Sequence, residues 1–375
     1  MKLYHAGDAV DWPATADGDE ARQYLEPLLQ RGPETYIANA HTALCALRAG
    51  PLLLPVTAAD FHPDNSYVCS PYAHYISYAV QEFSNLKNPP VEAGLRLLFR
   101  PLGAYFRRSR LDQVVYVNNW LLSTNLYPAG AAEQAAAIVD GLAAEFPDRA
   151  VVFRSVDERA NPDLFAALRA RGCRMVFSRS VYYQDVASDH VQRKRQYRED
   201  LKLFKRTPYQ VVDGAALSAA EAGRVLELYG ALYLDKYSRY NPRFTLEFIR
   251  LALAERLLHV RALARDGRID AVLGYVARRS YITAPLFGYD LRLPRELGLY
   301  RQLSTLISLE GLARGATVHL SAGVGSFKRI RGGLPALEYN AVYDAHLPAW
   351  RRRPWALLQL IADRLAVPVF QKYGF

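Results

Sequence analysis

The stretch 282–320 constrains the fold of this chain most, because two strand patterns flank a glycine-containing turn and an amphipathic helix. Apolar strands are predicted at 282–287 and 318–320, and residues 301–314 have a helical periodicity that ends at Gly315. The turn before this helix carries Arg295 and Gly298. This order directs several backbone N–H groups and the positive end of a helix dipole to one point, which favours binding of a phosphate group.

Composition bounds the class of protein. A chain of 375 residues is long enough for two domains, and 47 Lys and Arg against 37 Asp and Glu give a net charge of +10. Such a surface attracts nucleic acid, phosphorylated cofactors or anionic lipid, and the net charge does not distinguish among these three partners. Cys45, Cys69 and Cys173 are far apart, which predicts neither a disulfide framework nor a metal site. With no signal peptide or membrane span expected, we predict a cytoplasmic protein.

The first half of the chain alternates strands and helices. Strands are predicted at 114–120, 151–154 and 175–183, and helices at 130–146 and 164–171. A strand, a helix and a further strand form a crossover unit, so we predict an α/β (α+β) domain that closes near residue 187.

A basic segment at 188–207 separates this domain from a second pattern. Its residues 193–206 have two interpretations: a helix that binds the phosphates of tRNA, or a solvated linker helix. A strand, two helices, a three-stranded meander that turns at Asp266-Gly267, a helix and a strand then follow within 208–345.

This second pattern resembles the GNAT acyltransferase superfamily. The sequence Arg295-Glu296-Leu297-Gly298-Leu299-Tyr300 is similar to that family's pyrophosphate loop, which has Arg or Gln, two residues, Gly, one residue, and Gly or Ala. The resemblance implies that this loop binds the diphosphate of an acyl-coenzyme A and that the flanking strands splay apart for the pantetheine arm. It thereby assigns cofactor binding to Arg295, Gly298, Leu299 and Tyr300, although Tyr300 departs from the small last residue of the pattern.

The whole chain resembles two such domains in tandem, each a mixed twisted sheet flanked by helices. The expected parts are an N-terminal GNAT-like domain at 1–187 without a recognisable phosphate loop, the linker helix 188–207, a donor-binding domain at 208–345, and an amphipathic tail at 346–375. This organisation is similar to the Fem-like subgroup, whose members transfer amino acids from aminoacyl-tRNA to amines. It is also similar to two-domain acyltransferases that use acyl-coenzyme A-like donors.

Amide formation requires a base for the attacking amine and a hydrogen-bond donor for the developing oxyanion. The resemblance places the oxyanion donor among the backbone N–H groups of 284–289, so Tyr289 is a catalytic candidate. His319 and Asp290 are candidate bases, and His319 has the more suitable ordinary pKa. The alternative for His319 is a buried strand histidine that bonds to a backbone partner.

Further residues are predicted to bind the substrates. Tyr233, Lys236 and Tyr237 lie on the helix that covers the acceptor site in this family, or else form an exposed helix end. Ser321 begins a glycine-rich segment whose Lys328 favours an anionic donor, or else lies in a solvated loop.

We therefore predict an N-acyltransferase that forms an amide between an acyl-coenzyme A-type donor and a small amine or amino-acid-derived acceptor. The alternatives are an aminoacyl-tRNA-dependent transferase of Fem-like type and a non-catalytic GNAT-fold binding module. Residues 350–370 are basic, aromatic and then apolar. They predict either a helix that packs back onto the domains or a peripheral contact with an anionic membrane.

Overall fold

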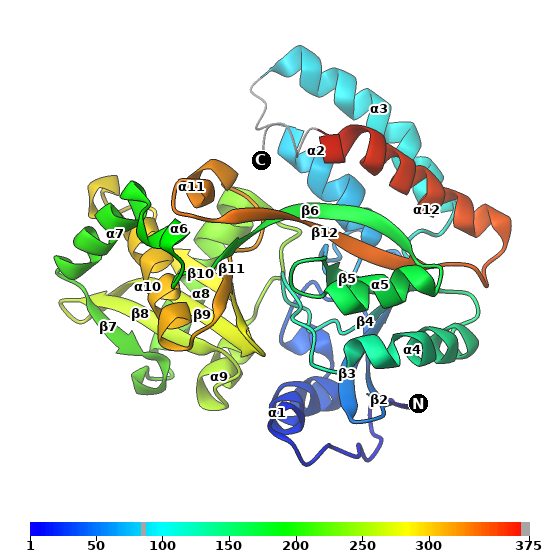
Figure 1. The fold of residues 1–375 in the computed structure, drawn as a ribbon, viewed down its shortest axis with the longest axis horizontal. Coiled ribbons are helices and arrows are strands. Elements are labelled where there is room, and N and C mark those ends of the chain that lie inside the picture. Colours follow the sequence, from blue (N-terminus) through cyan, green and yellow to red (C-terminus); the bar gives the residue numbers. More distant parts are fainter. Residues whose placement is uncertain (84–87, 369–375) are drawn as a thin grey trace. The chain divides into compact units, whose positions relative to one another are not determined.

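The computed structural model describes residues 1–83 and 88–368, and it divides the chain into two compact units (Figure 1). Unit 1 comprises Met1–Ser178, Ser238–Arg243 and Tyr339–Val367; unit 2 comprises Arg179–Tyr237 and Phe244–Glu338, together with Pro368. Both contain a mixed sheet with helices, which confirms the predicted α/β class. The basic segment 188–207 lies inside unit 2 rather than between two units.

The sheet of unit 1 contains antiparallel and parallel neighbours. Four strands form successive antiparallel pairs, the fifth is parallel to the fourth, and the last pairs antiparallel with the fifth through residues 339–343. In sheet order they are β1 (Lys2–Tyr4), β2 (Ala43–Ala49), β3 (Leu52–Ala59), β4 (Val114–Val117), β5 (Ala150–Val156) and β12 (Leu334–Tyr343). The α-helices of this unit are α1 (Ala16–Arg31), α2 (Tyr78–Glu82), α3 (Pro89–Arg108), α4 (Ala131–Glu145), α5 (Pro162–Ala170) and α12 (Ala349–Ile361).

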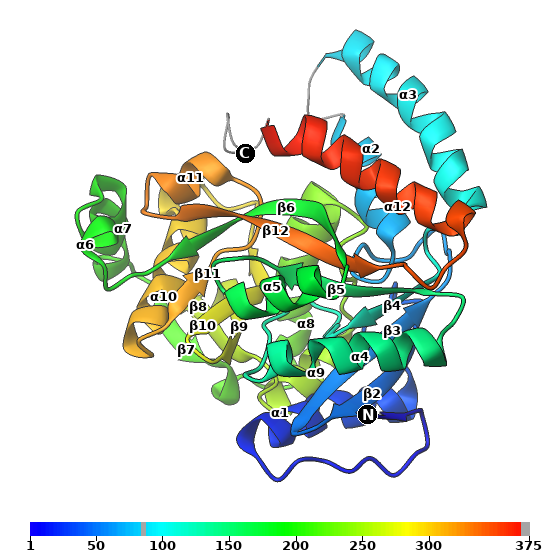
Figure 2. The same cartoon turned by 45° about the vertical axis from the view of Figure 1, so that its right-hand side comes forward.

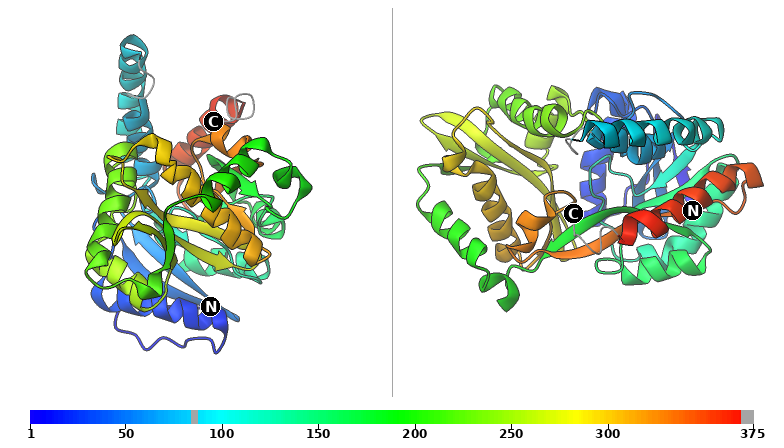
Figure 3. Two further views of the ribbon diagram at one scale, coloured as in Figure 1. Left: turned by 90° about the vertical axis from the view of Figure 1, so that its left-hand side faces the viewer. Right: turned by 90° about the horizontal axis from the view of Figure 1, so that it is seen from above.

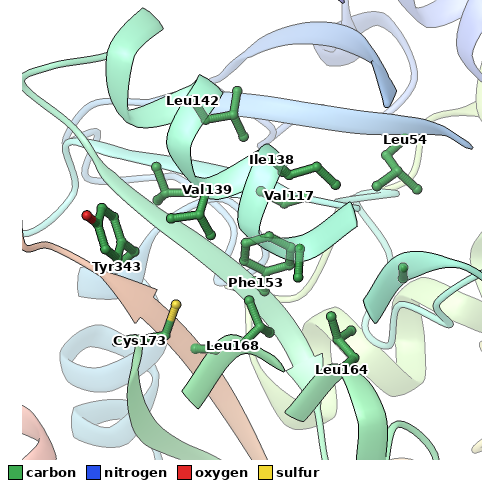
Figure 4. Close-up of a cluster of buried hydrophobic side chains, with 14 of the residues drawn as sticks. Leu54, Val117, Ile138, Val139, Leu142, Phe153, Leu164, Leu168, Cys173 and Tyr343 are labelled. Atoms are coloured by element: carbon green, nitrogen blue, oxygen red, sulfur yellow. The ribbon is translucent and has the colours of Figure 1, made fainter. Parts of the chain in front are cut away.

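The helix α4 connects the parallel strands β4 and β5, as the alternating sequence pattern predicts. It begins after Gly130, which has a left-handed backbone conformation, and it packs Ile138, Val139 and Leu142 onto the sheet. Figure 4 shows these side chains around Phe153 of β5, with Leu164 and Leu168 of α5 on the same cluster. Apolar residues at helical spacing thus form the main core of unit 1.

The sheet of unit 2 has one parallel pair, β10 with β11, among antiparallel neighbours. In sheet order its strands are β6 (Arg174–Gln184, from residue 179), β11 (Thr317–His319), β10 (Tyr281–Tyr289), β9 (Arg268–Arg278), β8 (His259–Arg265) and β7 (Gln210–Asp213). The α-helices are α6 (Asp189–Gln192), α7 (Arg195–Lys205), α8 (Glu221–Gly230), α9 (Leu246–Ala254), α10 (Leu299–Ala313) and α11 (Gly325–Arg329).

The crossover helix α10 joins β10 to β11 and is the element that positions the candidate site. Its buried Leu303, Leu306 and Ile307 lie in one apolar cluster with Ile282 of β10 and Val318 of β11. These contacts pack α10 against the sheet (Figure 2). In the chain, the N-terminus of α10 comes shortly after the C-terminal end of β10.

The C-terminal segment is also helical. Trp355 and Leu358 of α12 are buried in a core cluster of unit 1 together with Phe106, so this part of the predicted tail packs onto the protein. Residues 369–370 of the predicted membrane contact lie outside the described residues. No helix in the described residues is long and apolar enough to span a bilayer.

Candidate functional site

The strands β10 and β11 separate after a short parallel pairing. The pairing ends at Thr283, opposite His319, whereas β10 continues to Tyr289. Between Thr283 and Leu286 the register of β10 against β9 shifts, and such an irregularity bends a strand. In the described part of the chain, residues 286–289 pair with β9, and no residue of β10 beyond Thr283 pairs with β11. The hydroxyl of Thr283, at the point of separation, is buried without a hydrogen-bond partner among the described residues.

The N-terminus of α10 follows this separation. Arg295–Leu297 form a single 3-10 turn, and Gly298 precedes the helix with φ 62° and ψ 34°. No side chain caps the helix, and the first N–H groups of any α-helix lack an intrahelical acceptor. Together with the exposed Arg295, these N–H groups form a positively charged end that suits an anion.

The helix α7 flanks the same turn. Gly298 favours glycine because its φ is positive, and a Cβ atom added there would lie 2.8 Å from Leu203 Cδ2 of α7, whose side chain would have to move. Arg301 of α10 donates to Asp200 of α7 at 2.7 Å. The basic helix is therefore fixed beside the N-terminus of α10.

A group of aromatic side chains, which we call the aromatic cluster, occupies the region beside the free end of β10. The ring of Tyr300 lies 5.4 Å from Phe287, 6.0 Å from Tyr289 and 4.9 Å from Phe327, between ring centroids. Burial, and then the nearby hydroxyls of Tyr237 and other tyrosines, raise the pKa of Tyr300. Tyr300 is therefore neutral near neutral pH.

The predicted acceptor residues Tyr233, Lys236 and Tyr237 lie on a π-helical segment, Ala231–Tyr237, that follows α8. The Tyr233 and Tyr237 rings are 5.8 Å apart, and burial followed by the neighbouring Tyr289 raises the pKa of Tyr237. Both tyrosines thus border the aromatic cluster. Lys236 is exposed, with Nζ 5.9 Å from the Tyr237 ring centroid.

Lys328 belongs to a second group, which we call the buried polar cluster. Its Nζ donates to the carbonyl oxygens of Ser321 at 3.1 Å and Ala322 at 2.7 Å. Arg179 donates from Nε to Glu338 Oε1 at 2.7 Å and from Nη1 to Ser321 Oγ at 3.3 Å. Burial, and then the charge of Arg179, lower the pKa of Lys328 to about 7. Lys328 is therefore divided between its charged and neutral forms near neutral pH.

His319 is the remaining member of the buried polar cluster. Its Nδ1 accepts a hydrogen bond from the Ser321 N–H at 3.0 Å, and its Nε2 lies 3.9 Å from Glu338 Oε2. Burial, followed by the charges of Arg179 and Lys328, lowers the pKa of His319 to about 3. His319 is thus neutral, and the bond from Ser321 occupies its basic nitrogen. This geometry favours the alternative of a buried histidine with a backbone partner over a general base.

Asp290 lies in a network of three arginines. Its buried carboxylate pairs with Arg292 at 2.9 Å, Arg224 at 2.8 Å, and Arg268. Hydrogen bonds from Arg292 and Arg224 hold the pKa of Asp290 far below its usual range despite burial. A carboxylate that stays ionised and fully paired is poorly suited to accept a proton near neutral pH. Asp290 is therefore better explained as the anion that holds Arg224, Arg268 and Arg292 together than as the candidate base of the sequence analysis.

The sequence did not point to several residues of these clusters. Arg179 and Glu338 are 159 positions apart, and nothing local predicts their ion pair. Phe287 is an aromatic residue on an apolar strand, and Phe327 stands in a glycine-rich segment. Only their shared contact with Tyr300 marks them as part of one site.

Comparisons with known proteins give distant likenesses. No protein-family profile matches the chain, and no curated protein sequence does. FemX is 10% identical with a TM-score of 0.49, covering 96% of this chain and 100% of its own. L-PGS from Bacillus licheniformis is 15% identical with a TM-score of 0.45, covering 62% of this chain and 79% of its own. A GCN5-related N-acetyltransferase from Kribbella flavida is 16% identical with a TM-score of 0.32, covering 63% and 83%. The sequence identities are 16% or less and the TM-scores are below 0.5, so these likenesses assign no activity to this chain.

Proposed function

We propose that this chain is an N-acyltransferase whose unit 2 binds an activated acyl donor through a phosphate group on the carrier. The observation that carries the proposal is that an unpaired edge of β10 and the uncapped N-terminus of α10 follow one another in the chain. The strand leaves its parallel neighbour after Thr283, and the uncapped N-terminus of α10 follows at Gly298. A strand edge without a partner offers backbone groups to an acyl chain, and a helix N-terminus offers N–H groups to a phosphate.

The chain's residues have distinct roles in this proposal. The N–H groups of the first turn of α10, with Arg295, hold the phosphate. A backbone N–H of residues 284–289 stabilises the oxyanion that forms when the amine attacks the carbonyl carbon. The carrier leaves as the C–S bond of a thioester or the C–O bond of an ester breaks, and the amine loses one proton. Tyr233, Tyr237 and Tyr289 border the acceptor.

Lys328 is the group that we assign to accept the proton. Among the titratable residues of the two clusters, its pKa of about 7 is matched to proton transfer at neutral pH. Phe327 precedes Lys328 in the chain and belongs to the aromatic cluster. Adjacent residues therefore belong to the aromatic cluster and to the buried polar cluster.

The donor is proposed to be an acyl-coenzyme A, and one observation favours aminoacyl-tRNA as the second candidate. The helix α7 presents exposed Lys202 and Lys205, and the exposed Arg206 follows it directly. Leu203 of α7 lies next to the turn at Gly298. A row of cations beside a phosphate site suits a nucleic-acid backbone better than a single coenzyme.

Binding measurements separate these candidates. We would titrate the purified chain with acetyl-coenzyme A, a long-chain acyl-coenzyme A and a charged tRNA, each at low and high salt. Arg295→Ala removes the proposed phosphate contact, and Arg250→Ala, an exposed arginine on α9 of the same unit, is the matched control.

The expected result is that Arg295→Ala weakens donor binding about tenfold, the scale of one charge-assisted contact, while Arg250→Ala does not. Coenzyme A affinity with little salt dependence supports the first donor, and tRNA affinity that falls steeply with salt supports the second. Equal donor affinity in wild type and Arg295→Ala would contradict the phosphate assignment. Binding without transfer to any amine would support a binding module instead.

A further inference from the structure

The helix α3 of unit 1 carries three separate stripes of side chains. Its inner stripe packs against the core, since Phe106 is a member of a buried cluster and Phe99 and Leu102 pack onto it. A second stripe is exposed and apolar, and a third is exposed and cationic. The apolar stripe contains Val91, Gly94, Leu97, Leu98, Pro101 and Tyr105, and the cationic stripe contains Arg96, Arg100 and Arg107.

The apolar stripe is unusual in its exposure. Leu97 and Leu98 are 72% and 64% exposed, and Val91 and Tyr105 are 47% and 38% exposed. Val91, Gly94, Leu98, Pro101 and Tyr105 follow one another at spacings of three and four residues, which puts them on one side of the helix. Figures 2 and 3 show that the N-terminal half of α3 stands clear of the rest of unit 1. A contiguous exposed apolar stripe of this kind is typical of an interaction surface rather than of ordinary solvent exposure.

The charge on α3 indicates the chemistry of the partner. The helix has four arginines and one glutamate, and Glu92 is already paired with Arg96 at 2.9 Å. Arg107 lies over the Phe61 ring with its guanidinium 5.0 Å from the ring centroid. Arg100 and Arg108 are exposed. The partner must therefore accept apolar side chains and offer negative charge beside them.

We propose that α3 is an interfacial helix that docks this protein on the surface of an anionic lipid bilayer. The apolar stripe inserts into the boundary between headgroups and acyl chains, and the cationic stripe pairs with lipid phosphates. The chain's net charge of +10 adds long-range attraction to such a surface. The helix lies along the membrane and does not cross it.

A second copy of the chain fits this surface less well. In a two-fold contact the same stripe faces itself, which brings the arginines of both copies toward one another. Anionic lipid instead neutralises them. This surface is independent of the donor site in unit 2, so it can be tested by binding alone.

Vesicle flotation tests the proposal. The full chain is mixed with phosphatidylcholine vesicles that contain either no anionic lipid or about 30% phosphatidylglycerol, at low and high salt. We expect the protein to float with the anionic vesicles and the double substitution Leu97→Glu/Leu98→Glu to reduce the bound fraction more than about tenfold. A matched control, Val211→Glu/Leu312→Glu, changes two exposed apolar residues of unit 2 and should float like the wild type.

A second measurement reports the position of α3 directly. Cys45, Cys69 and Cys173 are buried, so Leu98→Cys adds one accessible thiol for an environment-sensitive fluorophore. Its emission should shift to shorter wavelength on anionic vesicles and remain unchanged on neutral ones. Flotation that persists in Leu97→Glu/Leu98→Glu, or a label that stays in water on bound vesicles, would overturn the proposal. So would a dimer that the double substitution disrupts while the wild type ignores lipid.

Discussion

The pKa of His319 predicts a specific pH dependence of stability. We would replace His319 by Asn, whose side-chain oxygen can take the place of Nδ1 as the acceptor for the Ser321 N–H. The variant keeps an acceptor in the buried polar cluster but has no group that titrates in acid. Comparing it with the wild type isolates the contribution of one imidazole.

The magnitude follows from linkage between protonation and folding. Unfolded His319 takes up a proton near its ordinary pKa of 6.5, whereas the folded chain resists until the pKa of about 3. Between these values the unfolded state binds more protons, so the free energy of unfolding falls as the pH falls. The slope approaches about 1.4 kcal/mol per pH unit below pH 6.5, and the change sums to about 2 kcal/mol between pH 7.5 and pH 5.

Urea unfolding at pH 7.5 and pH 5, followed by tryptophan fluorescence, measures this contribution. The wild type should be the more stable protein at pH 7.5, and its advantage over His319→Asn should shrink by about 2 kcal/mol at pH 5. An NMR titration of the imidazole provides a second readout. A stability difference that is equal at both pH values, or an imidazole that titrates near 6.5, would refute the assignment of a buried neutral histidine.

Three further predictions address other residues of unit 2. Asp290→Asn removes an anion that three arginines share. Arg268 and Arg292 are more than half exposed, and Asp270 still pairs with Arg224 and Arg268, so we expect a loss of about 1 kcal/mol in urea unfolding; an unchanged midpoint would contradict the network. Gly288→Ala places a Cβ atom 2.4 Å from the backbone of α8, whereas Gly230→Ala has no atom within 4 Å. We expect a loss of about 2 kcal/mol or more in the first variant only, and equal melting temperatures would show that the strand can shift freely. In an amide-forming assay, kcat/KM should rise as the pH passes about 7, the pKa of Lys328, and Lys328→Arg should lower it without that rise; identical pH profiles would remove Lys328 from proton transfer.

Local signals were sufficient to predict several elements. The periodicity of 301–314 and the glycine at 298 correspond to α10 and its N-terminus, and Asp266-Gly267 form the turn between β8 and β9 with positive φ at both residues. These features depend on neighbours within one turn or one hairpin, which a sequence pattern reflects directly.

The pairing of distant segments was not predictable from such signals. Residues 179–184 of β6 belong to unit 2, where Tyr183 pairs with His319, and residues 339–343 of β12 return to pair with β5 in unit 1. Periodicity marks a strand but does not identify its neighbour in the sheet. For the same reason, the pKa values of the candidate site could not be predicted from the sequence. The pKa of His319 is lowered first by burial in the assembled fold and then by the charge of Arg179, which is far away in sequence.

Hydrogen exchange measured by mass spectrometry tests the central claim most directly. The chain is compared alone, with a non-hydrolysable acyl-coenzyme A analogue, and with a non-hydrolysable aminoacyl-tRNA analogue. The account predicts that the donor that binds protects the amides of 284–289 and of the first turn of α10, Leu299 to Arg301. Protection of the α4 N-terminus after Gly130 in unit 1, with no change at α10, would contradict a donor site in unit 2.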